Sequence, residues 1–223
     1  MTYQWDFSFL VAYYPLLLQG LLRTVELALV SLVAGLTSGL FLGMARSSPR
    51  IWLRWPASCF IELFRNIPVL ILLFWFFFVM PMLLGTQTPP FVAAVVAFSV
   101  YLAAYSAEIF RAGIQSVEAG QWDAARSLGF GYFRSMRYCI LPQAIRRVIP
   151  ALTTQSIELV KTTALASTIA YGDILYQAKL ISDQELRPLE AYTVAAAMFI
   201  AMLVAFSYLS TQVEKLLSRS EQR

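Results

Sequence analysis

The sequence contains no histidine, few cysteines and few charged residues. None of the 223 residues is histidine, and the two cysteines, Cys59 and Cys139, do not form a paired motif, so the usual ligands of a zinc site are missing. Charged residues make up 13% of the chain and hydrophobic residues 59%, and the mean hydropathy is +0.64. Soluble domains are about 25% charged and about 45–50% apolar. The composition therefore predicts an integral membrane protein.

Two sequence motifs are also missing. The chain has no GxxxxGK(S/T) loop, which is the loop that cradles the phosphates of a nucleotide in many proteins. The first residues, MTYQWDFSFLVAYYP, have no basic start, and the apolar run after them is long and lacks a small-residue cleavage site. We therefore expect neither nucleotide hydrolysis by this chain nor a cleaved secretory signal.

Five stretches are long and apolar enough to cross a membrane as helices. Crossing a hydrocarbon layer of about 30 Å takes about 20 residues of helix. We predict spans at about residues 21–45, 67–84, 91–110, 148–171 and 191–213, in a single transmembrane domain of residues 1–223. The first span carries a face of small residues that suits close helix packing: Gly35, Ser38, Gly39 and Gly43. The predicted fold class is an all-α membrane protein with five transmembrane helices.

Positive charges gather after the first, third and fifth spans. These residues are Arg46, Arg50 and Arg54, then Arg111, Arg126, Arg134, Arg137, Arg146 and Arg147, and finally Lys215, Arg219 and Arg223. The loop after the second span has no Lys or Arg, and the loop after the fourth has two among several acids. Cytoplasmic loops carry the excess of Lys and Arg, so we predict an outside N-terminus and a cytoplasmic C-terminus. Both cysteines then fall at or near the cytoplasmic side and are predicted to be free thiols.

The charged stretch QWDAARSLGFGYFRSMRYCILPQAIRR lies in the predicted cytoplasmic loop at about residues 111–147. Its part DAARSLG predicts a short helix that Gly129 ends, since glycine is favoured just past a helix end. The next part, YFRSMRYCILP, predicts a second helix that has Phe133, Met136 and Ile140 on one face and that Pro142 breaks. The residues alone leave two interpretations open. The stretch either rests on anionic lipid as an amphipathic helix or forms a compact knob that a partner protein holds.

The same stretch resembles the signature loop of binding-protein-dependent ABC importer permeases. That signature is an acid-Ala-Ala triplet, three residues, Gly, nine residues, Ile, one residue and Leu-Pro. The matching residues are Asp123, Ala124, Ala125, Gly129, Leu141 and Pro142, with Asp123 in place of the usual Glu and Cys139 in place of the usual Ile. ELFRNIPVLILLFWF, AAYSAEIFRAGIQSVEAGQ and VKTTALAS resemble the polar amino-acid branch of that family, which includes glutamate/aspartate permeases. The resemblance extends from about residue 16 to 209.

The resemblance implies that the fold is like that of a type I ABC importer and that the loop is its coupling helix. In that family the coupling helix sits in a groove of a cytoplasmic ATPase and carries the motion of the ATPase into the membrane. The chain itself is then expected not to be an enzyme and to hold no cofactor, because ATP and Mg²⁺ bind to the separate ATPase subunit. With the resemblance added, the lipid-resting interpretation becomes the minor one.

The fourth predicted span is less hydrophobic than the others and carries a polar face. The residues on or near this face are Thr154, Glu158, Lys161, Thr162 and Thr163. Glu158 to Thr163 would lie roughly 15–22 Å into the span, near the membrane midplane. Ionisable groups at that depth are costly and usually face an interior or a watery cavity. Two interpretations remain: Glu158 and Lys161 only neutralise each other, or the face lines a path for an amino-acid zwitterion.

The region around KTTAL matches a part of the family that lies near the transport pathway, which favours the second interpretation. Many relatives have an acid directly after this lysine, whereas this chain has Thr162. Without a carboxylate at this position, the chain lacks one possible partner for the cationic side chain of a basic substrate. We therefore expect acidic or neutral polar amino acids as substrates rather than basic ones.

Three further charged residues lie near the predicted ends of spans. Arg65 is expected to be an interfacial anchor beside Trp52 and Trp55, with a place in the transport pathway as the alternative. Glu108 and Arg111 are three residues apart and are predicted to form an ion pair that braces the start of the cytoplasmic loop.

These features predict a permease subunit of an ATP-driven importer of polar amino acids, located in the inner membrane of a bacterium. Five helices are too few to enclose a path for a solute, so we expect a second permease subunit, identical or homologous. The other expected partners are an ATP-binding subunit, an extracytoplasmic amino-acid-binding protein and membrane lipid, but no nucleic acid. Import would proceed by alternating access. The alternatives are an ion-gradient-driven transporter or channel subunit, and a membrane scaffold or sensor that transports nothing.

Overall fold

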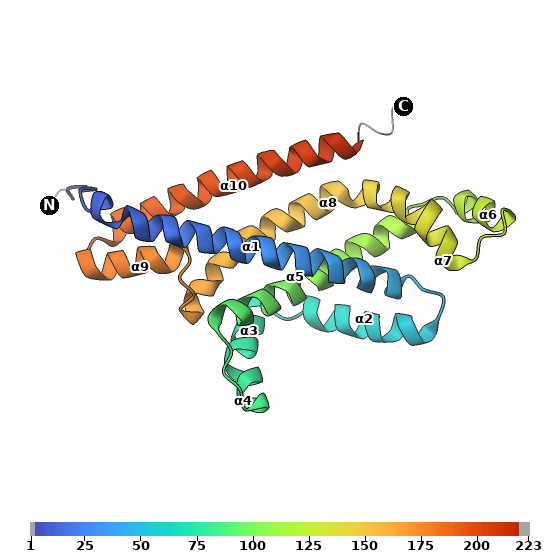
Figure 1. Ribbon diagram of the computed structural model, residues 1–223, viewed down its shortest axis with the longest axis horizontal. Coiled ribbons are helices and arrows are strands. Elements are labelled where there is room, and N and C mark those ends of the chain that lie inside the picture. The colour runs from blue at the N-terminus through green and yellow to red at the C-terminus, as the bar shows by residue number, and fades with distance from the viewer. Residues whose placement is uncertain (1–2, 219–223) are drawn as a thin grey trace. The chain divides into compact units, whose positions relative to one another are not determined.

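The computed structural model describes residues 3–218, with side chains for residues 3–212, and every regular element in this part is a helix (Figure 1). The α-helices are α1 (Leu10–Arg46), α2 (Ile51–Arg65), α3 (Val69–Phe74), α4 (Met80–Leu84), α5 (Pro90–Gln115), α6 (Ala119–Ser127), α7 (Tyr132–Ser135), α8 (Leu141–Thr162), α9 (Ile174–Glu185) and α10 (Pro188–Ser218). Two π-helical segments, η1 (Trp75–Val79) and η2 (Met136–Ile140), and one 3-10 helix, η3 (Thr163–Ile169), connect neighbouring α-helices. The predicted cytoplasmic charges Arg219 and Arg223 and the side chain of Lys215 lie outside the described residues.

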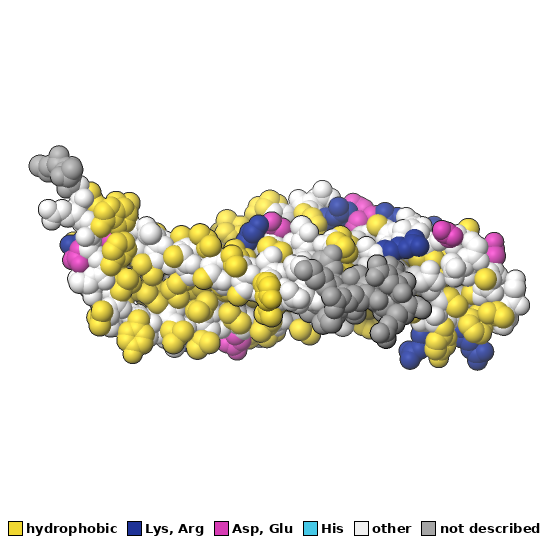
Figure 2. All heavy atoms as spheres, turned by 90° about the horizontal axis from the view of Figure 1, so that it is seen from above, with side chains coloured by type: hydrophobic (Ala, Val, Ile, Leu, Met, Phe, Trp, Pro, Cys, Tyr) yellow, Lys and Arg dark blue, Asp and Glu magenta, His cyan; other side chains and the backbone are white. Residues whose placement is uncertain are grey.

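Three helices of the described chain are long and apolar enough to cross a membrane: α1, α5 and the part Pro188–Gln212 of α10. A fourth crossing is counted if Ile51–Arg65 and Val69–Leu84 form one broken span, interrupted at residues 66–68. The helix α8 carries Arg146, Arg147, Glu158 and Lys161 and is too polar to qualify by composition. The count of five spans therefore stays a prediction. Many side chains on the face seen in Figure 2 are hydrophobic. On the long helices, the apolar side chains that are 62–81% exposed and suit contact with lipid include Val11, Leu22, Val33, Ile200 and Val204.

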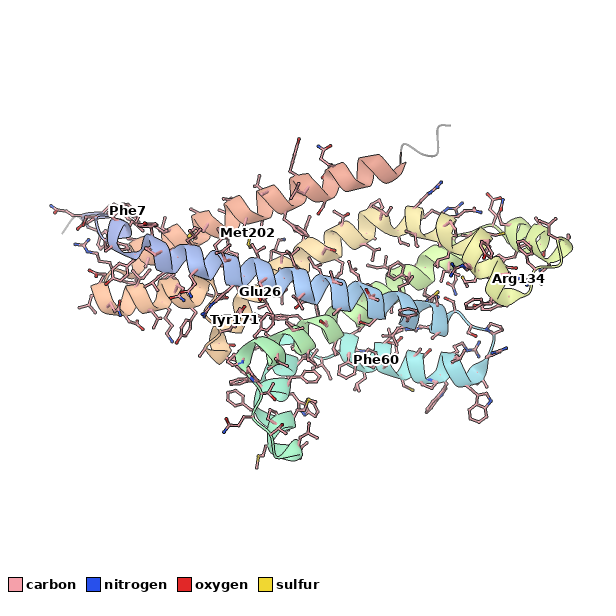
Figure 3. All side chains as sticks on the ribbon, in the orientation of Figure 1. Phe7, Glu26, Phe60, Arg134, Tyr171 and Met202 are labelled. Carbon is pink, nitrogen blue, oxygen red and sulfur yellow. The ribbon has the colours of Figure 1, made fainter. Side chains whose placement is uncertain are left out.

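The described chain divides into two compact units, each assembled from three separate stretches of the sequence. The first unit comprises residues 1–31, 69–98 and 157–207. In it the short helix α9 packs against the first half of α1 and the first half of α10, through Ile181 between Leu17 and Ala191 and through Ile174 beside Ala195. Two hydrogen bonds fix the start of α9 and the segment before it to α1. The Ile174 N–H donates to Thr24 Oγ1 at 3.2 Å. The Tyr171 O–H donates to the Arg23 carbonyl at 3.1 Å (Figure 3).

The second unit comprises residues 32–68, 99–156 and 208–223, and contains the predicted cytoplasmic loop. Its centre is the close contact between the second half of α1 and α5. A Cβ atom added at Gly35, Gly39 or Gly43 would lie within 3.0 Å of α5 atoms, so the small-residue face predicted for the first span is confirmed at these three glycines. The helix α2 joins this unit through its buried residues Ala57 and Ile61. Helices that approach this closely maximise their van der Waals contact.

The helix that follows Gly129 does not end at Pro142, which corrects the sequence prediction. The chain continues without a break from α7 through η2 into α8, and Pro142 lies in the first turn of α8. The π-helical segment η2 changes the hydrogen-bond ladder just before the proline: the Leu141 N–H donates to the Met136 carbonyl. Proline has no N–H to donate to the ladder, and the π-helical segment changes the ladder just before it, so the helix continues past Pro142. The helical part of the fourth predicted span accordingly begins at Leu141 rather than near Val148.

Candidate functional site

The predicted coupling loop folds as two helical segments joined by a turn, here called the knob: α6, the turn at residues 128–131, and the continuous helix of α7, η2 and the first two residues of α8, up to Pro142. Gly129 has a φ of +75°, in the left-handed region that favours glycine. Its N–H donates to the Arg126 carbonyl at 2.9 Å, and the Phe130 N–H donates to the Ala125 carbonyl at 3.1 Å. These bonds use carbonyls that the end of α6 leaves free. The prediction of two short helices that meet at a glycine turn is confirmed.

The six residues of the signature lie partly on the surface of the knob and partly beneath it. Asp123, Ala124, Gly129 and Pro142 are exposed. Ala125 is only 1% exposed, so it packs inside its own chain and cannot receive the backbone of a partner. Leu141 packs against the core cluster around Met136 and Ile140. A partner that docks on the knob can therefore meet four of the six residues, while the other two hold the knob in shape.

The second helix of the knob differs from its predicted face at one residue. Met136 and Ile140 are buried, as predicted, in a cluster with Ile114 from α5 and Ala144 from α8. Phe133 is 78% exposed instead, because it stands in the first turn of α7 ahead of the π-helical segment that turns Met136 inward. Phe133 and Leu128, which is 73% exposed, give the knob an apolar outer surface. Exposed apolar side chains of this size indicate a docking surface.

Side-chain contacts fix the knob to the ends of α1, α5 and α8. The Trp122 and Tyr132 rings stack with their centroids 5.9 Å apart, and the Tyr132 O–H donates to the Ser47 carbonyl just after α1, at 3.4 Å. Gln143 at the start of α8 donates to Gln121 of α6 at 3.2 Å. Burial raises the pKa of the Tyr132 hydroxyl above its ordinary value, so it stays protonated and able to donate. With contacts on both of its helices, the knob can transmit a force to this unit of the chain.

The basic residues of the knob differ in their partners. Arg126 forms an ion pair with Asp123 on the same exposed face of α6, and the Arg137 guanidinium lies 5.7 Å from the centre of the Tyr138 ring. Arg134, which Figure 3 labels on α7, has no ion-pair partner among the described residues. Exposed ion pairs contribute little to stability. The arginines of the knob are therefore available to a partner surface.

The polar face of α8 contains the ion pair that the simpler interpretation expected. Lys161 Nζ lies 2.8 Å from Glu158 Oε1, and the two side chains are 51% and 52% exposed. The Thr154 and Thr162 hydroxyls donate to carbonyls of their own helix, at 3.1 and 2.7 Å. Glu158 and Lys161 therefore form an ion pair, and the exposed parts of both side chains remain accessible to a solute.

Thr163 does not share this exposed face, which corrects its predicted place. It is 0% exposed, and its hydroxyl donates to the Val160 carbonyl at 2.7 Å. At about 100° per residue, Thr163 lies about 140° around the helix axis from Glu158, so regular helical spacing already turns it away from this face. In the first unit, the remaining candidate residues of the pathway are Glu158, Lys161 and Thr162.

An ion-pair network joins the ends of three helices next to the knob. Glu108 pairs with Arg111, as predicted, and its second oxygen lies 3.1 Å from Arg46 at the end of α1. Arg46 also pairs with Glu62 of α2 at 2.7 Å. The sequence does not predict the pairing of Arg46 with Glu62 and Glu108, because nothing in the local pattern links residues from different helices. The network braces the base of the cytoplasmic loop more broadly than a single pair could.

Arg65 is not beside Trp52 and Trp55, which corrects the predicted anchor. Both tryptophans lie in the first turns of α2, whereas Arg65 is its last residue, about 20 Å farther along the helix axis than Trp52 at 1.5 Å per residue. The Arg65 guanidinium lies 5.5 Å from the centre of the Tyr105 ring. The buried Nε of Arg65 has no hydrogen-bond partner among the described residues. A place in the transport pathway stays a prediction for Arg65.

Comparison with known proteins finds relatives along almost the whole chain. Residues 35–220 match the family described as "Binding-protein-dependent transport system inner membrane component". The chain is 37% identical over 216 residues to the probable amino-acid ABC transporter permease protein YckA of Bacillus subtilis, covering 95% of each chain. It is 35% identical over 213 residues to the probable glutamine ABC transporter permease protein GlnM of the same organism, covering 96% of this chain and 98% of the relative.

A solved structure has a similar fold. The crystal structure of an amino acid ABC transporter with histidines contains a chain that is 37% identical to this one and superposes with a TM-score of 0.86. The superposition covers 96% of this chain and 99% of the other.

Proposed function

Because this chain belongs to the binding-protein-dependent transport system inner membrane components and is a permease subunit of a bacterial amino-acid ABC transporter, we propose that its knob is the site at which a separate ATPase drives transport. The observation that carries this proposal is the exposed surface of the knob. It presents Asp123, Ala124 and Gly129 next to the apolar side chains Leu128 and Phe133. Membership of the family leads us to expect an ATPase subunit as the partner. The exposed surface of the knob is one to which such a subunit can bind.

The proposed mechanism is alternating access driven by the ATPase. ATP and Mg²⁺ bind to the partner, because this chain has no phosphate-binding loop. Alternating access requires an outward-facing and an inward-facing arrangement of the membrane helices. A partner shifts the equilibrium between them only if it interacts differently with each arrangement. The contacts of Trp122, Tyr132 and Gln143 with neighbouring helices support a role as a rigid lever. An extracytoplasmic binding protein would deliver the substrate, and a second permease subunit would complete the path.

The proposed substrates are polar amino acids, with acidic or neutral polar ones favoured. An amino-acid zwitterion needs a cation for its carboxylate and an acceptor for its ammonium group. Lys161 and Glu158 supply both within one exposed pair, and the neutral Thr162 leaves no second carboxylate beside the lysine. An ion-gradient-driven transporter, the alternative, gives no reason for a defined docking knob.

The coupling proposal is tested by a substitution at Gly129. Valine at this position needs the left-handed backbone conformation, which costs a β-branched residue about 1–3 kcal/mol. No neighbouring atom obstructs the new side chain, so the change acts through the shape of the turn. We expect Gly129→Val to abolish most substrate-stimulated ATP hydrolysis and uptake by the assembled transporter in proteoliposomes, while the protein still inserts into the membrane.

Gly131→Val is the matched control. Gly131 has a φ of −70° and a ψ of 167°, which valine adopts without strain, and its surroundings are equally open. This variant should keep both activities near wild type. Wild-type uptake with Gly129→Val would overturn the proposal, as would an equal loss with both variants.

A further inference from the structure

A groove beside the knob is lined by arginine and aromatic side chains. It has a volume of about 640 Å³ and is formed by the linker after α1, the start of α2, the end of α5 and the knob. The residues that line it and matter here are Arg46, Arg54, Trp122, Arg126 and Tyr132. A second hollow of about 470 Å³ shares Ser48, Pro49 and Tyr132 with it and adds Arg50 and Arg134. Neither lining contains an aspartate or a glutamate.

The arginines around the groove leave a net positive charge. Arg46 is neutralised by Glu62 and Glu108, and Arg126 pairs with Asp123. By contrast, Arg50, Arg54 and Arg134 are exposed and form no ion pair with any other described residue. Guanidinium groups bind phosphate oxygens through two parallel hydrogen bonds. The groove is therefore suited to a phosphate-bearing anion.

The residues next to the groove indicate that this anion is part of a membrane. Trp52 and Trp55, in the first turns of α2, are 87% and 66% exposed, and Leu53 lines the adjoining hollow. Tryptophan beside arginine is typical of the layer in which lipid headgroups lie. A phospholipid could place its phosphate on the arginines and its apolar chains along the exposed side chains of α2. A free anion in solution would not use those side chains.

We propose that this groove and the adjoining hollow bind the headgroup phosphate of an anionic phospholipid from the cytoplasmic leaflet, with Arg54 of the groove and Arg50 of the hollow as the main contacts. The proposal rests on the proposed function only in placing the knob at the cytoplasmic surface. The direct hydrogen bond between the knob and the linker after α1 is the Tyr132–Ser47 contact at 3.4 Å. A headgroup in the groove bridges the linker, α2 and the knob. It thereby stiffens the lever, so coupling increases with the fraction of anionic lipid.

The binding test uses the assembled transporter, purified in detergent, with phosphatidylglycerol as the probe and native mass spectrometry as the measurement. Removing a hydrogen bond to a charged group costs about 1.5–3 kcal/mol, which is about tenfold or more in affinity. We expect the Arg50→Gln/Arg54→Gln variant to bind phosphatidylglycerol at least about tenfold more weakly than wild type. Arg146→Gln is the control, because Arg146 is an exposed arginine of α8 outside both hollows, and it should bind normally.

A second measurement separates this proposal from other occupants. In nanodiscs, stimulated ATP hydrolysis of the wild type should rise when phosphatidylglycerol replaces phosphatidylcholine, and the double variant should not respond. Inorganic phosphate should not displace the lipid. The proposal is wrong if the double variant binds the lipid as wild type does, if Arg146→Gln weakens binding equally, or if free phosphate competes fully. It is also wrong if the double variant loses affinity for the ATPase subunit instead. Lipid binding is measured without transport, so failure of the coupling proposal leaves this result interpretable.

Discussion

Asp173 is a carboxylate in an unusual environment for a membrane protein of this composition. It is 0% exposed and caps the N-terminus of α9 by accepting a hydrogen bond from the Tyr176 N–H at 2.8 Å. Its other oxygen has no hydrogen-bond partner among the described residues. Burial raises the pKa of this carboxyl from its ordinary value to about 7, because the charged form is poorly solvated. The capping bonds lower the pKa again, but by less.

The pKa of Asp173 predicts a pH dependence of stability. A folded-state pKa above the unfolded value means that the folded protein binds the proton more tightly. Stability is therefore greatest below the unfolded pKa and falls as the pH rises through about 7. Asp173→Asn keeps the capping acceptor and removes the charge. We expect it to raise the free energy of unfolding at pH about 5 and at pH about 8, and to do so by roughly 1–3 kcal/mol more at pH about 8.

Thermal unfolding of the purified transporter at both pH values measures this effect. Asp183→Asn is the control, since Asp183 lies on α9 as well but is exposed, and it should leave the unfolding temperature unchanged at both pH values. Equal stability of Asp173→Asn and wild type at the higher pH would contradict the assignment.

The Glu158–Lys161 pair carries the prediction about the transport path. If the ammonium group of Lys161 receives the substrate carboxylate, Lys161→Ala should lower uptake about tenfold or more at saturating binding protein, since a hydrogen bond to a charged group is worth about 1.5–3 kcal/mol. Glu158→Ala should change the relative uptake of acidic, neutral polar and basic amino acids. Uptake of a labelled panel in proteoliposomes measures both effects.

Lys179→Ala serves as the comparison, because Lys179 is an exposed lysine of α9 and should not affect transport. Loss of folded protein with normal kinetics in the remainder would support the simpler interpretation, in which the two charges only neutralise each other.

At the scale of elements, the contact between α1 and α5 depends on glycine. A Cβ atom at Gly43 would lie 2.7 Å from the Ala107 carbonyl oxygen and 2.8 Å from Phe110 Cβ. The first of these is backbone, so the helices would have to move apart. Overpacking of this kind costs about 1–3 kcal/mol. We expect Gly43→Ala to lower the free energy of unfolding of the assembled protein in detergent by that amount.

Gly120→Ala provides the contrast, because no atom lies within 4 Å of a Cβ added at Gly120 on α6. Alanine also favours a helix more than glycine does, so this variant should be as stable as wild type or slightly more stable. A Gly43→Ala protein as stable as wild type would show that the two helices are not in close contact.

The elements that the sequence predicted well are those with a local physical cause. The end of α6 follows from the left-handed backbone at Gly129, and the close face of α1 follows from small residues at helical spacing. Pro142 and Thr163 were predicted wrongly for different reasons. Pro142 follows the π-helical segment η2, which residue types alone do not indicate. Thr163 lies about 140° around the helix axis from Glu158 by regular helical spacing, so it does not share the face of Glu158 and Thr162.

At the scale of the whole molecule, the sequence determined the class of protein and predicted the knob as the site of coupling. Apolar content, the absence of a phosphate-binding loop and the order of residues around Gly129 are properties of the chain itself. They act through solvation and local backbone preference, which need no tertiary contacts. The family to which the chain belongs agrees with them.

The tertiary structure decided which of these residues face outward and which groups meet. It buries Ala125 and exposes Phe133, brings Arg46 to Glu62 and Glu108, and places Tyr132 at Ser47, 85 positions earlier in the sequence. It also forms the arginine-lined groove from four separate segments. Contacts of this kind depend on how helices distant in sequence pack together. Periodicity and capping signals act over a few residues only and do not specify that packing.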